Sequence, residues 1–369
     1  MFLSAALSTF AADTVSYRIR QLENWAFYGT QNPTVELVAK NSRGVQMPLD
    51  IKCEIWGANG VSMYELSQKS TIPQMDSIAL SFAFKTMSPG FYNAIFWQGA
   101  KMVRSVNIAY EPGKILPYNT PLPDDFLPEF SRDYTKMANQ VALERRDLNP
   151  QYTLTRNKKL SGKEKNVYDF KMFSRGGKVV KGLAAFPKGK KGIAAMITFV
   201  PVENMNVNPL ADFTAPSDMA ELVIYISQNG DGEEYFKNLL TEVVLSIDFF
   251  AQRGEIDSSK IFTQGEGTGA VYAFLASTLD DNVAASFVAT PDFRRFAESF
   301  TLESLVKKVS VPVLFGLGLQ DKTAKLQDDF AIYNMVSSVK EYFIFPGIGS
   351  VERNQWKYIR DMFILRMGL

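Results

Sequence analysis

Hydrophobic and polar residues alternate in short segments along the first part of the chain, from about residue 15 to residue 110. Turn sequences, such as those at 42–44 and 88–90, separate these segments. Alternation with a period of two is typical of strands that bury only one face, and closely spaced turns are typical of antiparallel sandwiches. We therefore expect a β-sandwich domain over residues 13–110.

A proline-rich segment follows the alternating segments. It carries prolines at positions 112, 117, 121, 123 and 128. Because proline can continue neither a helix nor a central strand, this segment indicates a linker. A helical pattern comes after it, so we assign residues 111–150 to a linker followed by a helix.

The pattern changes again beyond residue 151. A hairpin pattern comes first, and then single apolar runs, which alternate with helical stretches, of which 234–252 has the clearest 3.6-residue period. Strands that alternate with helices predict a mainly parallel sheet with helices on both faces. Residues 151–369 are therefore expected to form a doubly wound α/β domain. The predicted strands are 193–200, 221–227, 260–264, 284–290, 311–319 and 340–346.

Charge and cysteine content narrow the range of partners. The 369 residues include 40 basic and 39 acidic ones, a formal charge of +1. This balance gives no electrostatic reason to expect nucleic acid or an anionic membrane as a partner. The lone cysteine, Cys53, shares a strand face with Ile51 and Ile55, which indicates a buried small hydrophobic residue.

The chain contains no histidine, and this excludes several kinds of catalytic site. A Ser-His-Asp triad, a Cys-His pair and a histidine zinc site all require imidazole. Any enzymatic proposal must therefore use a lysine or a carboxylate as its base. The sequence contains no pattern that calls for a metal or another cofactor, and we expect none.

The chain begins with an apolar run from Phe2 to Phe10, which ends in small residues at Ala11 and Ala12. Small residues after an apolar run are typical of the cleavage end of a secretory signal, although a basic start is missing. We expect residues 1–12 to be a signal-peptide remnant and the protein to be exported to the periplasm or outside the cell. An apolar N-terminal strand is the alternative. No other run approaches the roughly 18 apolar residues of a membrane span.

A glycine-rich turn joins an apolar strand to a helix in IFTQGEGTGAVYAF, residues 261–274. Gly265, Gly267 and Ala270 fit the dinucleotide pattern G-x-G-x-x-A, but earlier strands precede this turn, and the next acidic residue, Asp292, lies late. The same turn fits the nucleophile elbow G-x-S-x-G, with Gly267 in the place of the serine. We favour the elbow.

Two downstream segments complete the elbow pattern. VPVLFGLGLQD, 311–321, ends in an acid after a strand, and PGIGS, 346–350, follows the next strand. With the turn GEGTGA, 265–270, this order resembles the acetyl xylan esterase and cephalosporin-C deacetylase group of α/β-hydrolases. The resemblance covers 151–369 and implies an α/β-hydrolase fold. In that group the second segment ends in a histidine.

The resemblance places the family's nucleophile on Gly267, its acid on Asp321 and its base on Ser350. One oxyanion N–H would come from the backbone of Thr268. The other would come from a glycine-rich segment, whereas the corresponding segment here, 198–213, has no glycine and contains prolines at 201 and 209. No intact catalytic triad is therefore expected. The Thr268 and Ser350 hydroxyls are interpreted as turn and loop residues, and Asp321 as a relic that caps a turn, with ligand binding as the alternative.

Two further charged segments are interpreted as solvated surface. The loop at 227–236 contains Asp231, Glu233 and Glu234, but it lacks the spacing of a calcium loop. Lysines gather at 187–192, where a hairpin ends. We predict no binding role for either.

The loss of nucleophile and base predicts a non-catalytic relative of the esterases, a pseudo-esterase. It would bind an acylated carbohydrate or a protein partner in an exported complex. The alternative is an active carboxylic-ester hydrolase of the carbohydrate deacetylase type that pairs a serine or threonine with a lysine or carboxylate. A crevice at Gly267 that is open and polar would favour ligand binding, and one filled by side chains such as Met205 or Phe213 would favour a scaffold role.

Overall fold

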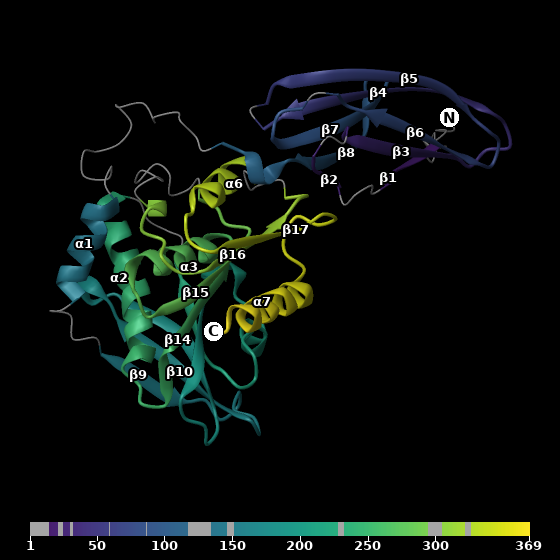
Figure 1. Cartoon of the computed structure of the whole chain (residues 1–369). Helices are drawn as coiled ribbons and strands as arrows, with labels where there is room; N and C mark the ends of the chain where they lie inside the picture. The colour runs from purple at the N-terminus through teal and green to yellow at the C-terminus, as the bar shows by residue number, and fades with distance from the viewer. Residues whose placement is uncertain are drawn as a thin grey trace, which may run out of the picture. The chain divides into compact units, whose positions relative to one another are not determined.

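The computed structural model describes residues 15–20, 25–29, 32–58, 60–85, 87–116, 134–145, 151–227, 232–293, 305–321 and 326–369. The chain divides into two compact units, Met1–Ile115 and Leu116–Leu369, and each is described by itself (Figure 1). The predicted signal peptide at 1–12 lies outside the described residues. So does most of the predicted linker.

The first unit is a β-sandwich. Within the described residues, a three-stranded sheet has the order β1-β3-β6 and a five-stranded sheet the order β2-β8-β7-β4-β5. All neighbouring strands are antiparallel apart from the short β2, which pairs in parallel with β8. The strands are β1 (Val15–Arg20), β2 (Ala26–Phe27), β3 (Thr34–Asn41), β4 (Met47–Gly57), β5 (Ser62–Ile72), β6 (Ser77–Ala83), β7 (Gly90–Gln98) and β8 (Lys101–Tyr110).

Alternation along each strand forms the core of the sandwich. In β4 the side chains of Leu49, Ile51, Cys53 and Ile55 are buried, because residues two apart in a strand share one face. Burial raises the pKa of the Cys53 thiol to about 12. The cysteine is therefore an inert core residue, as its sequence pattern predicts.

The second unit contains a nine-stranded sheet in the order β17-β16-β15-β14-β12-β13-β11-β10-β9, counted within the described residues. The strands from β13 through β12 and β14 to β17 are parallel, and β11, β10 and β9 continue the sheet in antiparallel fashion. The predicted mainly parallel sheet and its hairpin are confirmed. The strands are β9 (Tyr152–Arg156), β10 (Lys165–Phe173), β11 (Val179–Pro187), β12 (Ile193–Pro201), β13 (Ala220–Ile226), β14 (Ile256–Glu266), β15 (Val283–Ala289), β16 (Val313–Gly318) and β17 (Lys340–Phe345).

Helices cover both faces of this sheet (Figure 1). Helices α2 and α3 pack on one face, and α7 packs on the other, where Trp356 and Phe363 join the strand core. Helix α3 is apolar all round because the sheet and α2 enclose it. The helices are α1 (Tyr134–Arg145), α2 (Gly232–Ala251), α3 (Thr268–Leu279), α6 (Leu326–Met335) and α7 (Arg353–Met367), with 3₁₀ turns at Pro112–Lys114, Arg175–Gly177, Val202–Asn204 and Pro209–Asp212.

The start of α3 approaches the sheet closely through two glycines. A Cβ atom at Gly269 would lie 2.2 Å from the carbonyl oxygen of Phe199 on β12, and one at Gly265 would lie 2.2 Å from the carbonyl carbon of Gly269. Real Cβ atoms do not approach backbone atoms this closely, because the separation is well inside van der Waals contact. Glycine at both positions therefore lets the turn after β14 fold tightly against β12.

We predict that Gly269→Ala destabilises the protein by about 1–3 kcal/mol, because the added methyl group would push α3 off β12. Chemical denaturation followed by circular dichroism measures the change. Gly254→Ala is the matched control, since a Cβ there meets no atom of the described residues within 4 Å. It should change the free energy of unfolding by no more than about 0.5 kcal/mol. Equal stability of the two variants would contradict the close approach.

Candidate functional site

The turn between β14 and α3 has a backbone conformation that glycine adopts without strain and other residues rarely adopt. Gly267 has φ 58° and ψ −125°, a region that residues with a side chain rarely adopt. Its N–H donates to the carbonyl oxygen of Ala289 at 3.0 Å, and its own carbonyl accepts from the N–H of Ala270 at 3.1 Å. A sharp, strained strand-to-helix turn is the geometry of a nucleophile elbow.

The apex of the turn, at Gly267, has room for a side chain. A Cβ atom on Gly267 would meet no atom of the described residues within 4 Å. The flanking Gly265 and Gly269 are explained by the packing of α3, so the three glycines need no phosphate ligand to account for them. Neither Met205, which is 48% exposed, nor Phe213 approaches this Cβ position.

The segments that carry Asp321 and Ser350 lie side by side. Asp321 follows β16 and Ser350 follows the neighbouring β17, and the Gln320 N–H donates to the carbonyl oxygen of Ile348 at 2.9 Å. A Cβ on Gly349 would lie 3.2 Å from the Cα of Asp321. Ser350 is exposed, and Asp321 is half-buried. The structure thus brings the predicted acid and base positions together.

A second carboxyl group is buried close to this edge of the sheet. Asp329, on the first turn of α6, is 2% exposed, and its Oδ2 atom has no hydrogen-bond partner among the described residues. Burial, and next the charge of Asp292, raise the pKa of Asp329 well above its ordinary value, and the backbone N–H of Phe293 opposes the rise. Asp321 adds a weaker repulsion.

The segment after β12 uses many of its backbone N–H groups internally. The N–H groups of Met205 and Ala211 donate to carbonyl oxygens of the segment's own 3₁₀ turns, at 3.3 and 2.9 Å. The Leu210 N–H donates to the side chain of Asn208 at 3.2 Å. These donors are occupied and do not point to an oxyanion. Thr268, the other predicted donor, begins α3 and is 5% exposed.

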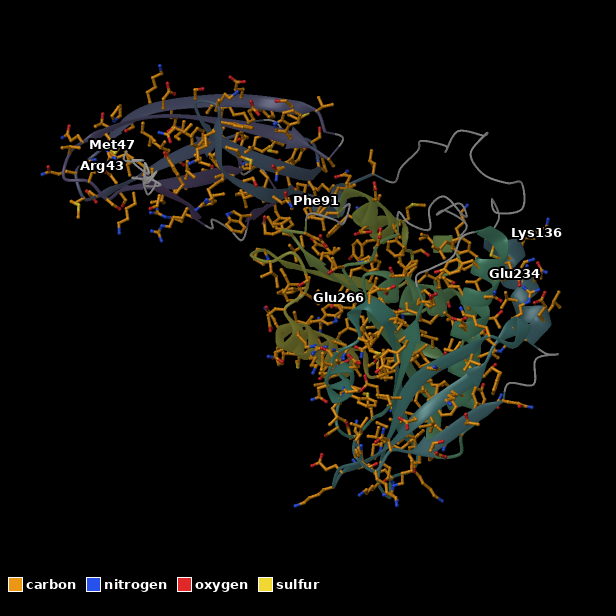
Figure 2. All side chains as sticks on the ribbon, turned by 180° about the vertical axis from the view of Figure 1, so that it is seen from behind. Arg43, Met47, Phe91, Lys136, Glu234 and Glu266 are labelled. Carbon is orange, nitrogen blue, oxygen red and sulfur yellow. The ribbon has the colours of Figure 1, made fainter. Side chains whose placement is uncertain are left out.

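A cavity of about 140 Å³, lined by both polar and apolar side chains, adjoins the turn. It lies between the carboxyl ends of β12 and β14, the segment after β12 and the start of α7, and it reaches Gly265 and Glu266 of the turn. Figure 2 labels Glu266. Neither Met205 nor Phe213 lines the cavity. Its wall consists of Thr198, Phe199, Val200, Pro201, Asn204, Asn206, Asp212, Thr214, Gln264, Gly265, Glu266, Ala289, Val351, Arg353, Trp356, Lys357 and Arg360.

A buried hydrogen-bond network forms the floor of the cavity. Arg360, which is 1% exposed, donates from Nη1 to the side-chain oxygen of Gln264 at 2.7 Å and from Nη2 to the carbonyl oxygen of Thr214 at 2.9 Å. Gln264 donates to the Thr198 hydroxyl at 2.8 Å, and that hydroxyl donates to Glu221 at 2.7 Å. Buried polar groups with satisfied partners hold one geometry, so this network fixes α7 against the sheet.

The carboxyl groups at the cavity differ in their surroundings. Asp212 is buried and accepts hydrogen bonds from the Tyr225 hydroxyl at 2.9 Å and from the Asn206 side chain. Glu266 lines the cavity, and desolvation of its carboxyl group raises its pKa. Arg353 opposes this rise, and Asp321 adds to it. Glu266 and Asp321 are therefore close enough to interact.

The other charged segments are accounted for without a ligand. Glu234 pairs with Arg175 at 3.3 Å, whereas Asp231 and the Glu233 side chain lie outside the described residues. In the lysine cluster, Lys188 donates to the carbonyl oxygen of Gly162 at 2.9 Å. Within the described ranges, no group of three or more His, Cys, Asp or Glu side chains could hold a metal ion. No helix there is long and apolar enough to span a bilayer.

The network residues were not predicted from the sequence. Glu221 offers one local signal, because a carboxylate that opens an otherwise apolar central strand requires buried partners. Its partners include the backbone N–H groups of Thr214 and Ala215, which donate to the Glu221 carboxylate. No sequence pattern marks these two residues as its partners. Arg360 comes from the C-terminal helix, far away in the sequence, and only the fold brings it to Gln264.

This chain is similar to known proteins in its structure and not in its sequence. Neither a protein-family model nor a curated protein matches the sequence. Acetyl xylan esterase 1 from Thermoanaerobacterium sp. JW/SL YS485 is similar with a TM-score of 0.56 and 15% identity, over 69% of this chain and 97% of that one. The acetyl xylan esterase from Paenibacillus sp. R4 has a TM-score of 0.55 and 18% identity, over 67% of this chain and 99% of that one.

These similarities confirm the predicted fold. The chain has the α/β-hydrolase fold of the two acetyl xylan esterases, and a β-sandwich precedes it. Both esterase chains are covered almost completely, whereas about a third of this chain lies outside the match.

We predict that Asp329→Asn makes the stability of the protein less dependent on pH. A raised pKa means that the folded state holds its proton to a higher pH than the unfolded state, which loses it near pH 3.9. Stability of the unsubstituted protein should therefore fall as the pH rises through this window, because the buried carboxyl must ionise. The variant should lose this fall and be the more stable form above the window.

Denaturation midpoints measured from pH 4 to pH 8 test this prediction. Asp281→Asn is the control, because Asp281 is exposed and its substitution should leave the pH profile unchanged. Parallel profiles for Asp329→Asn and the unsubstituted protein would contradict a buried, neutral carboxyl group.

Proposed function

We propose that this protein is a pseudo-esterase, which keeps the scaffold of an acetyl xylan esterase-like hydrolase but has lost its catalysis and binds an acylated carbohydrate. One observation carries the proposal. Gly267 stands at the apex of a turn with the geometry of a nucleophile elbow, in a chain that contains no histidine. A glycine has no oxygen to acylate, and no imidazole can activate another residue.

The residues at the other two triad positions also support a loss of catalytic activity. Ser350 occupies the base position, and a serine hydroxyl is not a general base at neutral pH. Asp321 retains the acid position beside it, but an acid in a triad acts by orienting and stabilising a histidine. In the segment after β12, the N–H groups of Met205, Leu210 and Ala211 are occupied, so they supply no second oxyanion donor. Loss of a triad member alone lowers catalysis by several orders of magnitude.

The character of the cavity supports ligand binding over a purely structural role. Its lining combines amide, hydroxyl, carboxyl and cationic side chains with the aromatic Phe199 and Trp356. Sites for small polar ligands use such a mixture, in which a few placed polar groups set the orientation. We infer an acylated carbohydrate from the two acetyl xylan esterases of the same fold, and we expect the protein to act outside the cytoplasm. A protein partner is the other outcome of the test.

We predict that the purified protein neither hydrolyses p-nitrophenyl acetate above the buffer rate nor reacts with a fluorophosphonate probe. An activated serine should label within minutes, whereas an unactivated hydroxyl should not. A known serine esterase in the same assay serves as the positive control. Labelling that is lost in Ser350→Ala would instead establish the alternative, an active hydrolase with a displaced catalytic set.

We predict that Gly267→Ser combined with Ser350→His produces esterase activity, because it supplies a nucleophile and a base at the positions where the esterase resemblance places them. The rate should exceed that of either single variant by at least about tenfold, since nucleophile and base act as a unit. Gly267→Ser should also lower the free energy of unfolding by about 1–3 kcal/mol, because serine is strained at this φ and ψ. A folded double variant without activity would contradict the assignment of these positions.

A further inference from the structure

The start of α7 presents three cationic side chains to the cavity. Arg353, Lys357 and Arg360 all line it, and their spacing places them on one face of the helix. They lie opposite the carboxyl ends of β12 and β14. This group of three cations was not predicted from the sequence.

Two of these three cations have no partner within the described part of the chain. Arg360 is satisfied by Gln264, by the Thr214 carbonyl oxygen and by Asp361, which accepts from its Nε atom at 2.9 Å. Arg353 and Lys357, in contrast, have no hydrogen bond or ion pair with any described residue. Lys357 is half-buried, and a cation that is partly removed from water without a partner is unfavourable, so a bound anion would relieve it. Arg353 is exposed and can reach the same anion from the rim of the cavity.

The charges around Lys357 support the interpretation that its ammonium group has no anionic partner among the described residues. Its half-buried side chain has a lowered pKa, first because of burial and then because of repulsion by Arg353 and Arg360. Glu221 and Asp361 attract it but do not outweigh these causes.

Two carboxyl groups at the site, those of Asp212 and Glu221, are engaged by other residues. Asp212 is held by Tyr225 and Asn206. Glu221 accepts from Thr198 and from two backbone N–H groups. The exposed Glu266 attracts Arg353, but within the described residues no hydrogen bond or ion pair joins it to Arg353 or Lys357. The surplus of unpaired donors therefore points into the cavity.

We propose that this cavity binds a sugar acid, with the carboxylate held between Arg353 and Lys357. Guanidinium and ammonium groups form short, charge-assisted hydrogen bonds with carboxylates. Asn204 and Asn206 offer side-chain amides for the ring hydroxyls of the same ligand. At about 140 Å³, the cavity is smaller than a drug-sized site of ~300–1,000 Å³, so it accommodates one small polar unit. The sugar part rests on the proposed function, whereas the anionic part rests on the cations alone.

Isothermal titration calorimetry with D-glucuronate and D-glucuronamide tests the inference, because the two sugars differ only in the charged group. We expect glucuronate to bind at least about tenfold more tightly to the unsubstituted protein. Lys357→Met and Arg353→Gln should each reduce this preference by about tenfold. Arg366→Gln is the matched control on the same helix, since Arg366 pairs with Glu341 and does not line the cavity. It should keep the full preference.

Equal binding of the two sugars, or a preference that survives Lys357→Met in a folded protein, would overturn the inference. If sulfate bound with the same affinity as glucuronate and displaced it, the sugar part of the inference would be overturned, because the cavity would then be a general anion site. A titration with acetylated xylobiose separates the two proposals. Binding of this neutral sugar without a glucuronate preference overturns only the sugar acid site, whereas a glucuronate preference without xylobiose binding overturns only the proposed acylated ligand.

Discussion

The close approach of α3 to β12 is the constraint on which the candidate site depends. Gly269 leaves no room for a Cβ beside the Phe199 carbonyl oxygen, and Gly265 leaves none beside Gly269. The helix begins close to the strands, and the residue before it, Gly267, takes a backbone conformation with φ 58° that favours glycine. The same turn places Glu266 at the cavity and brings the end of β14 beside the ends of β12 and β15.

A glycine at the apex has a physical advantage once catalysis is lost. A serine with φ 58° would hold about 1–3 kcal/mol of backbone strain, which an enzyme tolerates in exchange for an exposed nucleophile. Glycine adopts the same conformation without that strain. Under the proposed function, the substitution at Gly267 removes a destabilising feature that no longer serves a reaction, in line with the general trade-off between stability and activity.

Much of the fold could be predicted from the sequence, because hydrophobic periodicity is a local property. The runs at 193–200 and 284–290 correspond to β12 and β15, and the 3.6-residue period at 234–252 corresponds to α2. The proximity of the segments that carry Asp321 and Ser350 also follows from the sequence pattern, since neighbouring strands in a parallel sheet end at one edge. The cavity could not be predicted from the sequence. Arg360 and Gln264 come into contact only because α7 packs on the sheet, and no local sequence pattern predicts a contact between residues so far apart in the chain.

The central claim is that the site binds an acylated carbohydrate without cleaving it, and one nuclear magnetic resonance sample tests both halves. Isotope-labelled protein is mixed with acetylated xylobiose, and the backbone signals of the protein and the acetyl signal of the sugar are followed for several days. The account predicts that the backbone signals of Glu266 and Lys357 shift on addition of the sugar. The acetyl ester signal should decay no faster than it does in buffer alone. Release of free acetate above that rate, or an unchanged protein spectrum at millimolar sugar, would contradict it.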